Sequence, residues 1–433
     1  ASINTVNKNP LEPQVIMPTA ADVEKAAEII SGVVERTPLY YSPRLSEMTG
    51  AKIYLKREDL QGVRSYKIRG AYNVIAQLND EQRRAGVVAA SAGNHAQGVA
   101  YACRTLGVQG RIYVPSNTPK QKRDRIMYHG GDAIELVVTG NSFDDAAAAA
   151  MQNAQDSGAT WVAPFDNPST IAGQGTVARE IVEQLADIGE QPSMVIVPVG
   201  GGGLLSGVVT YLAETSPETE VIGVEPAGAA SVAAALDMGG PVTLGDTDPF
   251  VDGAAVKRCG DVTYAILDAH RKMIDLLTVS EGSVCTEMLD LYQNEGIIAE
   301  PAGALSVTAL QQLRFAPGSS VVCIISGGNN DVSRYSEIIE RSLVDRGLKH
   351  YFLVNFTQKP GQLREFLDRV LGPDDDITLF EYVKRNNRET GAALVGIQLG
   401  TATGLHALLH RMEESGIECE RLLPGTPAYE YLT

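Results

Sequence analysis

The chain of 433 residues lacks the features that mark membrane, secreted and nucleic-acid-binding proteins. No apolar run approaches the roughly 18 to 20 residues that span a bilayer, and residues 1–18 lack the basic segment followed by an apolar one that a secretory signal has. A net charge of −17 repels a phosphate backbone, and no dense cluster of lysine and arginine offsets it. We therefore expect no membrane and no nucleic acid as partner, and a cytoplasmic location.

Cysteine is scarce, and its five copies follow no pattern. They are Cys103, Cys259, Cys285, Cys323 and Cys419. An odd number without C-x-x-C spacing argues against a disulfide framework and against a zinc site. We expect most of them to be small buried hydrophobic residues.

Length and composition describe a globular protein with more than one domain. At roughly 150 residues per domain, the chain is expected to hold two or three cores. The 44% hydrophobic and 21% charged content is that of a folded chain rather than a disordered one.

Between about residues 51 and 331, short β-branched runs alternate with longer helical stretches. This alternation is typical of an α/β fold, in which helices cover a parallel sheet. The predicted strands are 51–55, 86–90, 111–114, 134–138, 194–199, 221–224 and 321–325. The predicted helices are 94–105, 120–129, 143–157 and 169–185.

The pattern changes near residues 341–350. The segments from "YFLVNF" to "HRMEESG" predict strand, helix, strand, strand and helix, which is most of a ferredoxin-like α+β unit. We therefore expect a separate C-terminal domain over residues 344–433, after a region that covers residues 1–343.

Four glycines follow an apolar strand in "VIVPVGGGGLLSG" and precede a helical stretch. A strand, a glycine loop and a helix N-terminus form an anion site, because backbone N–H groups and the positive end of the helix dipole face the same point. The G-K-[ST] of a P-loop is absent, and the third glycine of G-x-G-x-x-G is missing. We expect a bound phosphate other than a nucleotide's; the alternative is a flexible turn.

Two further strand ends carry polar motifs. "ASAGNHAQG" offers Ser91, Asn94 and His95, and "ISGGNND" offers Ser326, all at the edge of the sheet where ligands of open α/β folds bind. The alternative for the first motif is an asparagine helix cap beside a buried histidine with satisfied hydrogen bonds.

Lys67 stands in "RSYKIRGA" between an aromatic and an apolar residue. A lysine must lose its proton to react with an aldehyde, and burial or nearby cations lower its pKa. Arg64 and Arg69 are candidate cations. The alternative is an ordinary solvated lysine.

In this order and spacing, "ADVEKA", "SYKIRGA", "SAGNHAQG", "GGGGLLSG", "VDGAAVKR" and "ISGGNND" resemble the fold-type II pyridoxal-phosphate enzymes, and most closely the biosynthetic threonine dehydratase family. The resemblance covers roughly residues 17–343. It implies a tryptophan synthase β-like fold with two open parallel-sheet domains, a large one over about 1–60 and 165–343 and a small one over about 61–164.

The resemblance also implies the roles of individual residues. Lys67 is the catalytic lysine that forms the Schiff base with pyridoxal 5′-phosphate, Asn94 binds the ring hydroxyl, and Ser326 faces the pyridine nitrogen. The phosphate is held by Gly200, Gly201, Gly202, Gly203 and Leu204. The substrate carboxylate is received by Ser91, Ala92, Gly93, Asn94 and His95.

No metal is expected, because the residues after Glu225 lack the acidic partner with which some eukaryotic relatives bind a cation. The implied reaction is the β-elimination of L-threonine, and also L-serine, to a 2-oxoacid and ammonia, which for threonine is the first committed step of isoleucine biosynthesis. A serine hydroxyl at the pyridine nitrogen leaves that nitrogen largely unprotonated, which favours elimination over transamination.

The segment from about residue 350 resembles the ACT-like regulatory extension of this family. The resemblance implies isoleucine as allosteric inhibitor, valine as its antagonist and a homo-oligomer, either a tetramer or a dimer. The alternatives are an oligomerisation module without a ligand, a serine dehydratase with racemase activity, a β-replacement enzyme of the same fold, or an amino-acid sensor without turnover.

Overall fold

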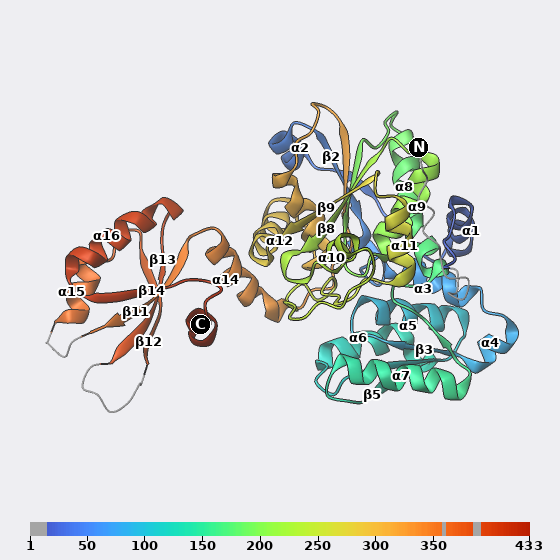
Figure 1. Cartoon of the computed structure of the whole chain (residues 1–433), viewed down its shortest axis with the longest axis horizontal. Helices are drawn as coiled ribbons and strands as arrows, with labels where there is room; N and C mark the ends of the chain where they lie inside the picture. The colour runs from blue at the N-terminus through green and yellow to red at the C-terminus, as the bar shows by residue number, and fades with distance from the viewer. Residues whose placement is uncertain (1–14, 357–360, 384–390) are drawn as a thin grey trace. The chain divides into compact units, whose positions relative to one another are not determined.

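The computed structural model describes residues 15–356, 361–383 and 391–433. Two compact units share the chain, Ala1–Asn330 and Asp331–Thr433 (Figure 1). Residues 1–14 of the expected large domain, and two segments of the expected C-terminal domain, lie outside the described residues. The domain boundaries expected from the sequence stay predictions.

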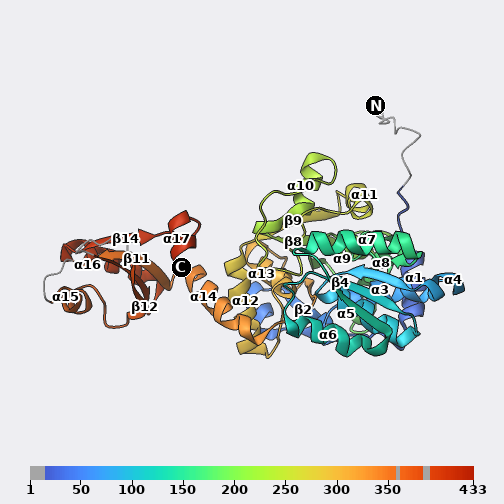
Figure 2. The same cartoon turned by 90° about the horizontal axis from the view of Figure 1, so that it is seen from below.

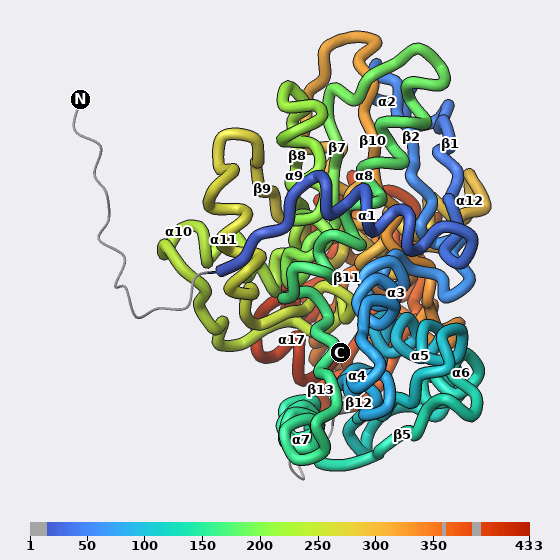
Figure 3. Tube along the Cα trace, turned by 90° about the vertical axis from the view of Figure 1, so that its right-hand side faces the viewer, coloured from blue at the N-terminus to red at the C-terminus, as the bar shows by residue number. Residues whose placement is uncertain are grey.

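The first unit contains a six-stranded sheet. Its strands, in spatial order, are β1 (Leu39–Tyr41), β2 (Lys52–Arg57), β10 (Ser320–Ile325), β7 (Met194–Pro198), β8 (Glu220–Pro226) and β9 (Ile274–Val279). All neighbours run parallel except β1 and β2. Figure 3 shows the order from β9 on the left to β1 on the right. β7 and β10 are buried along their whole length, as expected for parallel strands covered on both faces.

A second, fully parallel sheet belongs to the same unit. Its strands are β5 (Ile134–Val138), β4 (Gly110–Val114), β3 (Val87–Ala90) and β6 (Thr160–Trp161). The seven predicted strands are therefore confirmed. β1 and β6 were missed because two or three residues carry no periodicity, and β9 because its burial does not alternate regularly.

Helices surround both sheets. Their bounds are α1 (Ala20–Ile30), α2 (Pro43–Thr49), α3 (Lys67–Ala76), α4 (Asp80–Ala85), α5 (Asn94–Leu106), α6 (Lys120–Gly130), α7 (Phe143–Ser157), α8 (Pro168–Ala186), α9 (Gly203–Thr215), α10 (Ser231–Met238), α11 (Asp261–Ala269), α12 (Glu281–Glu295) and α13 (Leu305–Thr308). The four predicted helices are confirmed as α5, α6, α7 and α8. None of the described helices is long and apolar enough to cross a membrane.

A buried ionic network fixes helix α3 against its neighbours. The guanidinium of Arg69 is fully buried and donates to the carboxylates of Glu58, at 2.6 Å, and Glu180, at 2.9 Å. Lys56 on β2 donates to the same Glu180 oxygen at 2.9 Å. Burial of charges is costly unless they are paired, and here each guanidinium edge meets a carboxylate. Arg69 therefore anchors the helix that begins with Lys67.

The C-terminal unit is a ferredoxin-like sandwich after helix α14 (Tyr335–Asp345). It contains β11 (Lys349–Asn355), α15 (Gln362–Arg369), β12 (Asp376–Val383), β13 (Ala392–Gln398), α16 (Leu405–Ser415), β14 (Glu418–Leu422) and α17 (Pro427–Leu432). The antiparallel strand order is β12-β13-β11-β14. Helices α15 and α16 cover one face of the sheet and α17 packs on the other (Figure 2). The predicted strand and helix order is confirmed, with β14 completing the unit.

Candidate active site

Lys67 is brought to a strand end of the large sheet by the loop that precedes α3. Ser65 pairs as an isolated bridge with Gly327, and the backbone N–H of Tyr66 donates to the carbonyl of Ser326 at 3.2 Å. Ser326 directly follows β10 and is buried. Lys67 and Ser326, which are 259 positions apart in the sequence, therefore lie side by side.

The Lys67 amine lies in a partly apolar setting. Its Nζ donates to the carbonyl of Pro164 at 2.9 Å and lies 5.5 Å and 6.0 Å from the ring centres of Tyr66 and Phe165. Burial lowers the pKa of Lys67 to about 8, although the nearby Glu300 acts in the opposite direction. A neutral amine is thus accessible near neutral pH, which nucleophilic attack and proton abstraction both require.

Of the two expected causes of this low pKa, burial is confirmed and the candidate cations are not. Arg69 is held in its pairs with Glu58 and Glu180, and Arg64 is exposed. Neither contributes to the shift of the Lys67 pKa, which burial produces.

Helix α5 presents the SAGNH motif to the same point. It packs so closely on the start of α3 that a Cβ on Gly98 would lie 3.2 Å from the Lys67 carbonyl carbon. His95 donates from Nε2 to the carbonyl of Val162 at 2.8 Å, and burial together with Lys67 lowers the His95 pKa to about 3. His95 is therefore a neutral, fixed ring. The Ser91 hydroxyl accepts from the N–H groups of Gly93 and Ala96 and shapes the loop.

Glu300 is a site residue that sequence reasoning missed. Its carboxyl accepts from Asn94 Nδ2 at 2.6 Å and from the backbone N–H of Asn329 at 2.9 Å. The Asn329 amide in turn donates to Asn94 Oδ1 at 2.7 Å, so the orientation of Asn94 is fixed from both sides. Burial raises the pKa of Glu300 to about 8. No motif marks Glu300, because it follows a helix rather than a strand.

The tetraglycine loop connects β7 to α9. Gly202 has φ +94°, which a residue with a side chain rarely adopts, and no side chain caps α9 within the described part of the chain. The first turn of α9 is nevertheless buried, so its unpaired N–H groups lack protein acceptors. A Cβ on Gly201 would lie 2.4 Å from the Phe165 ring, so only glycine allows this approach.

Residues 162–166 join these parts, and sequence reasoning missed them as well. The carbonyls of Val162 and Pro164 accept from His95 and Lys67, the Phe165 ring lies on Gly201, and the Asp166 carboxylate caps the first turn of α11. The segment follows β6, so it is one more strand end at the same edge. Strand β6 could have pointed to this segment, but with only two residues it leaves no recognisable pattern in the sequence.

These residues fit pyridoxal phosphate. The buried, uncapped N-terminus of α9 suits the phosphate, and a lysine with a lowered pKa suits the aldehyde. Ser326 Oγ makes no hydrogen bond to the described residues and is available to the ring nitrogen. The structure brings together the predicted lysine, the SAGNH loop, the glycine loop and Ser326. The Glu225 carboxylate, at the end of β8, accepts from the N–H groups of Val232 and Ala233 at 2.8 and 2.9 Å.

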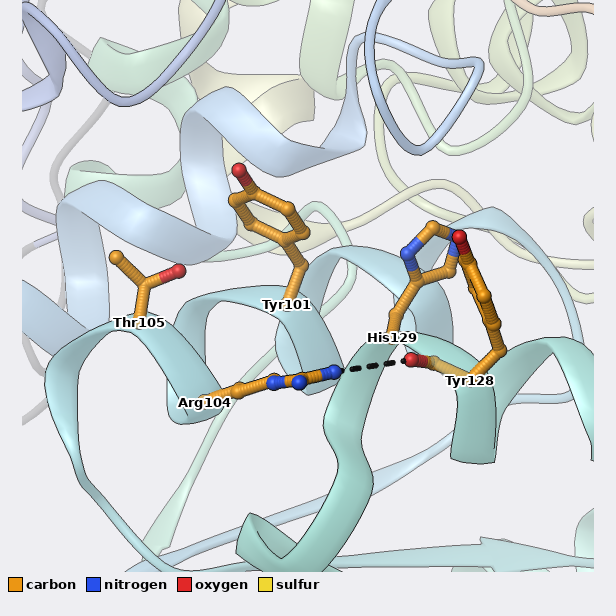
Figure 4. A pocket seen from close by; sticks show the side chains of 5 residues that line it. All are labelled: Tyr101, Arg104, Thr105, Tyr128 and His129. Atoms are coloured by element: carbon orange, nitrogen blue, oxygen red, sulfur yellow. Dashed lines mark hydrogen bonds between the residues drawn. The ribbon is translucent and has the colours of Figure 1, made fainter.

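A separate groove lies between α5 and α6 (Figure 4). It is lined by Tyr101, Arg104, Thr105, Tyr128 and His129 and has a volume of about 570 Å³. Arg104 lies ten residues along α5 from Asn94, which places it roughly 15 Å from the SAGNH loop. The groove contains none of the predicted site residues.

Comparisons with known proteins identify the family of this chain. A family model described as pyridoxal-phosphate dependent enzyme matches residues 30–327, and one described as the C-terminal regulatory domain of threonine dehydratase matches residues 340–432. The biosynthetic L-threonine dehydratase of Corynebacterium glutamicum is 68% identical over 96% of this chain and 95% of the relative. That of Mycobacterium bovis is 63% identical over 99% of both.

A solved structure is also similar. The processed form of threonine deaminase isoform 2 from Solanum lycopersicum has a TM-score of 0.68 and 36% identity, and the match covers 77% of this chain and 98% of that one. The chain therefore belongs to the pyridoxal-phosphate-dependent enzymes and, within them, to the biosynthetic threonine dehydratases.

Proposed function

We propose that this chain converts L-threonine to 2-oxobutanoate and ammonia at the site around Lys67, and that L-serine is a second substrate. The observation that carries the proposal is a lysine whose pKa is lowered to about 8 at the meeting point of a glycine loop and three polar strand ends. Bound pyridoxal phosphate supplies an aldehyde for the substrate amine and a ring that draws electrons from the α-carbon.

Residues of the chain bind the cofactor and the substrate. The N–H groups of Gly200 to Leu204 hold the phosphate, and Asn94, fixed by Glu300 and Asn329, holds the ring hydroxyl. The loop from Ser91 to His95 receives the substrate carboxylate through its backbone N–H groups.

Lys67 moves the proton. Its neutral amine takes the α-proton of threonine, and the β-hydroxyl leaves as water with a proton that the Lys67 ammonium returns. The four-carbon enamine that remains is hydrolysed by water, so each threonine yields one 2-oxobutanoate and one ammonia. The Ser326 hydroxyl donates to the ring nitrogen instead of protonating it, which favours loss of the β-substituent over transfer of the amino group.

The C-terminal unit is the regulatory part. We propose that isoleucine lowers activity through it and that valine opposes isoleucine, which needs a coupling free energy of only about 1 to 3 kcal/mol. We further propose a homo-oligomer and a cytoplasmic location.

The function is tested with Lys67→Ala and, as a control, Lys120→Ala, whose side chain is 79% exposed on α6. Both are assayed with threonine, by 2-oxobutanoate and ammonia formation. Lys67→Ala should lose the visible absorption of the bound cofactor and nearly all turnover, while Lys120→Ala should keep both. Substantial turnover by Lys67→Ala would refute the assignment. Threonine kinetics with and without isoleucine test the regulation.

A further inference from the structure

The groove between α5 and α6 takes no part in the proposed reaction. Two tyrosines, a threonine, an arginine and a histidine line it, and every one of these side chains can donate a hydrogen bond. Figure 4 shows side chains of both helices around it. Its volume of about 570 Å³ lies within the range of roughly 300 to 1,000 Å³ that small-molecule pockets have. The groove is therefore large enough for a ligand, and its lining offers donors without an acidic group.

Three arginines surround His129 without a counter-charge. Burial lowers the pKa of this histidine to about 4, and the positive charges of Arg125, Arg64 and Arg104 act in the same direction. Within the part of the chain that the structure describes, none of the three arginines forms an ion pair. The chain as a whole carries a net charge of −17, so a local excess of positive charge is unexpected. The excess favours an anion from outside the chain.

The Arg104 guanidinium is held in place by backbone groups. Its Nη1 donates to the carbonyl of Tyr128 at 3.3 Å, the dashed line in Figure 4. A Cβ on Gly131 would lie 3.7 Å from the Arg104 Cζ, so the guanidinium lies against the backbone of Gly131. A guanidinium has five N–H donors, and the other donors of Arg104 have no acceptor among the described residues. They remain available to a ligand.

Arg125 is held by the aromatic side of the groove. Its Nη2 donates to His129 Nε2 at 3.3 Å, and its Cζ lies 5.2 Å from the centre of the Tyr128 ring. His129 is only 7% exposed, and with a pKa of about 4 its ring is neutral near neutral pH. The ring therefore fixes the Arg125 guanidinium without cancelling its charge.

We propose that this groove binds a small molecule that bears two or more phosphate groups, with phosphate oxygens on Arg104 and Arg125. Guanidiniums pair with carboxylates and phosphates, but a planar carboxylate matches one guanidinium, whereas a terminal phosphate presents three acceptor oxygens to donors from different directions. One carboxylate would also leave most of the positive charge of the three arginines uncompensated. The occupied groove lies on α5, whose first residues belong to the SAGNH loop.

The test is isothermal titration calorimetry of the full-length enzyme with pyrophosphate, at low ionic strength and without divalent cations. Loading pyridoxal phosphate first keeps pyrophosphate out of the glycine loop. Arg104→Gln and Arg125→Gln should each weaken binding about 10- to 100-fold, as expected for loss of a charge-assisted hydrogen bond. Thr105→Trp fills the groove and keeps all three charges, and it should weaken binding at least tenfold.

Arg84→Gln is the matched control, because it removes the same charge from an exposed position on α4 of the same unit. It should bind pyrophosphate as wild type does. Citrate, which carries several carboxylates but no phosphate, should bind at least tenfold more weakly than pyrophosphate. Both measurements separate recognition in the groove from a general attraction of anions.

Several results would overturn the proposal. They are the absence of pyrophosphate binding to wild type at millimolar concentration, wild-type affinity in both arginine variants, wild-type affinity in Thr105→Trp, and citrate binding as tightly as pyrophosphate. If pyrophosphate does not bind and the variant that combines Arg104→Gln with Arg125→Gln sediments as a smaller species, the groove is a contact between copies of the chain instead. If the arginine variants do not fold, Thr105→Trp and citrate decide the question.

Discussion

Adding one methyl group at Gly201 tests the proposed phosphate site. A Cβ there would lie 2.4 to 2.5 Å from three atoms of the Phe165 ring, far inside van der Waals contact. Phe165 also lies near Lys67, with its ring centre 6.0 Å from Nζ. Either the ring or the glycine loop must move, and both are parts of the proposed cofactor site.

The size of the effect follows from this overlap. Extra atoms in a packed site usually cost about 1 to 3 kcal/mol. Without cofactor the loop can relax, but with phosphate bound its N–H groups must keep their positions. The cost therefore reduces the free energy of cofactor binding. Gly201→Ala should therefore weaken pyridoxal phosphate binding roughly 5- to 150-fold.

The assay removes the cofactor and titrates it back while visible absorbance is recorded. Gly62→Ala is the matched control, because Gly62 is exposed and a Cβ there meets nothing within 4 Å. The control should bind the cofactor as wild type does. An apparent dissociation constant for Gly201→Ala within twofold of wild type would refute the proposed position of the phosphate.

Four further predictions concern buried groups. In Glu300→Gln the amide oxygen can accept from Asn94 or from the Asn329 N–H but not from both, so kcat/KM for threonine should fall roughly tenfold. Folding raises the Glu300 pKa from about 4.3 to about 8. The stability of wild type should therefore fall as pH rises between these two values and then level off. Melting temperatures of Glu300→Gln should lack this pH-dependent fall. Arg69→Met leaves the buried Glu58 carboxylate without a cation and Glu180 with Lys56 alone, and should lower the free energy of unfolding by about 3 to 5 kcal/mol in urea titrations. Arg179→Met, which removes a partly exposed side chain, should lower it by less than about 1 kcal/mol. A thiol reagent should modify at most Cys419 quickly in the native enzyme, because the other four cysteines are buried. After denaturation it should modify all five. Fast reaction of a second thiol in the native enzyme would contradict the fold.

The sequence predicted the parts of this site that a strand end marks. Buried strands such as β7 and β10 read as continuous apolar runs, and the glycines or polar residues after them stand out locally. Because the parallel strands of one sheet place their carboxyl ends at one edge, the meeting of Gly201 and Ser326 followed from topology. Asn94 follows β3 in the second sheet, and the packing of α5 against α3 brings it to the same point.

The residues that were missed depend on tertiary contacts. Glu300 acquires its role from Asn94 and Asn329, which are distant in sequence, and Phe165 from its contact with Gly201. Arg69 was misread for the same reason: its neighbour in sequence is Lys67, but its partners are Glu58 and Glu180. Nothing in local spacing indicates which way a helical side chain points across to another element.

The covalent position of the cofactor tests the central claim most directly. The enzyme loaded with pyridoxal phosphate is reduced with borohydride, which makes the link between lysine and cofactor permanent, then digested and analysed by mass spectrometry. The label should be found on the peptide that contains Lys67 and should be absent when threonine is turned over in excess during reduction. A label on another lysine, or a fully active enzyme with none, would contradict the account.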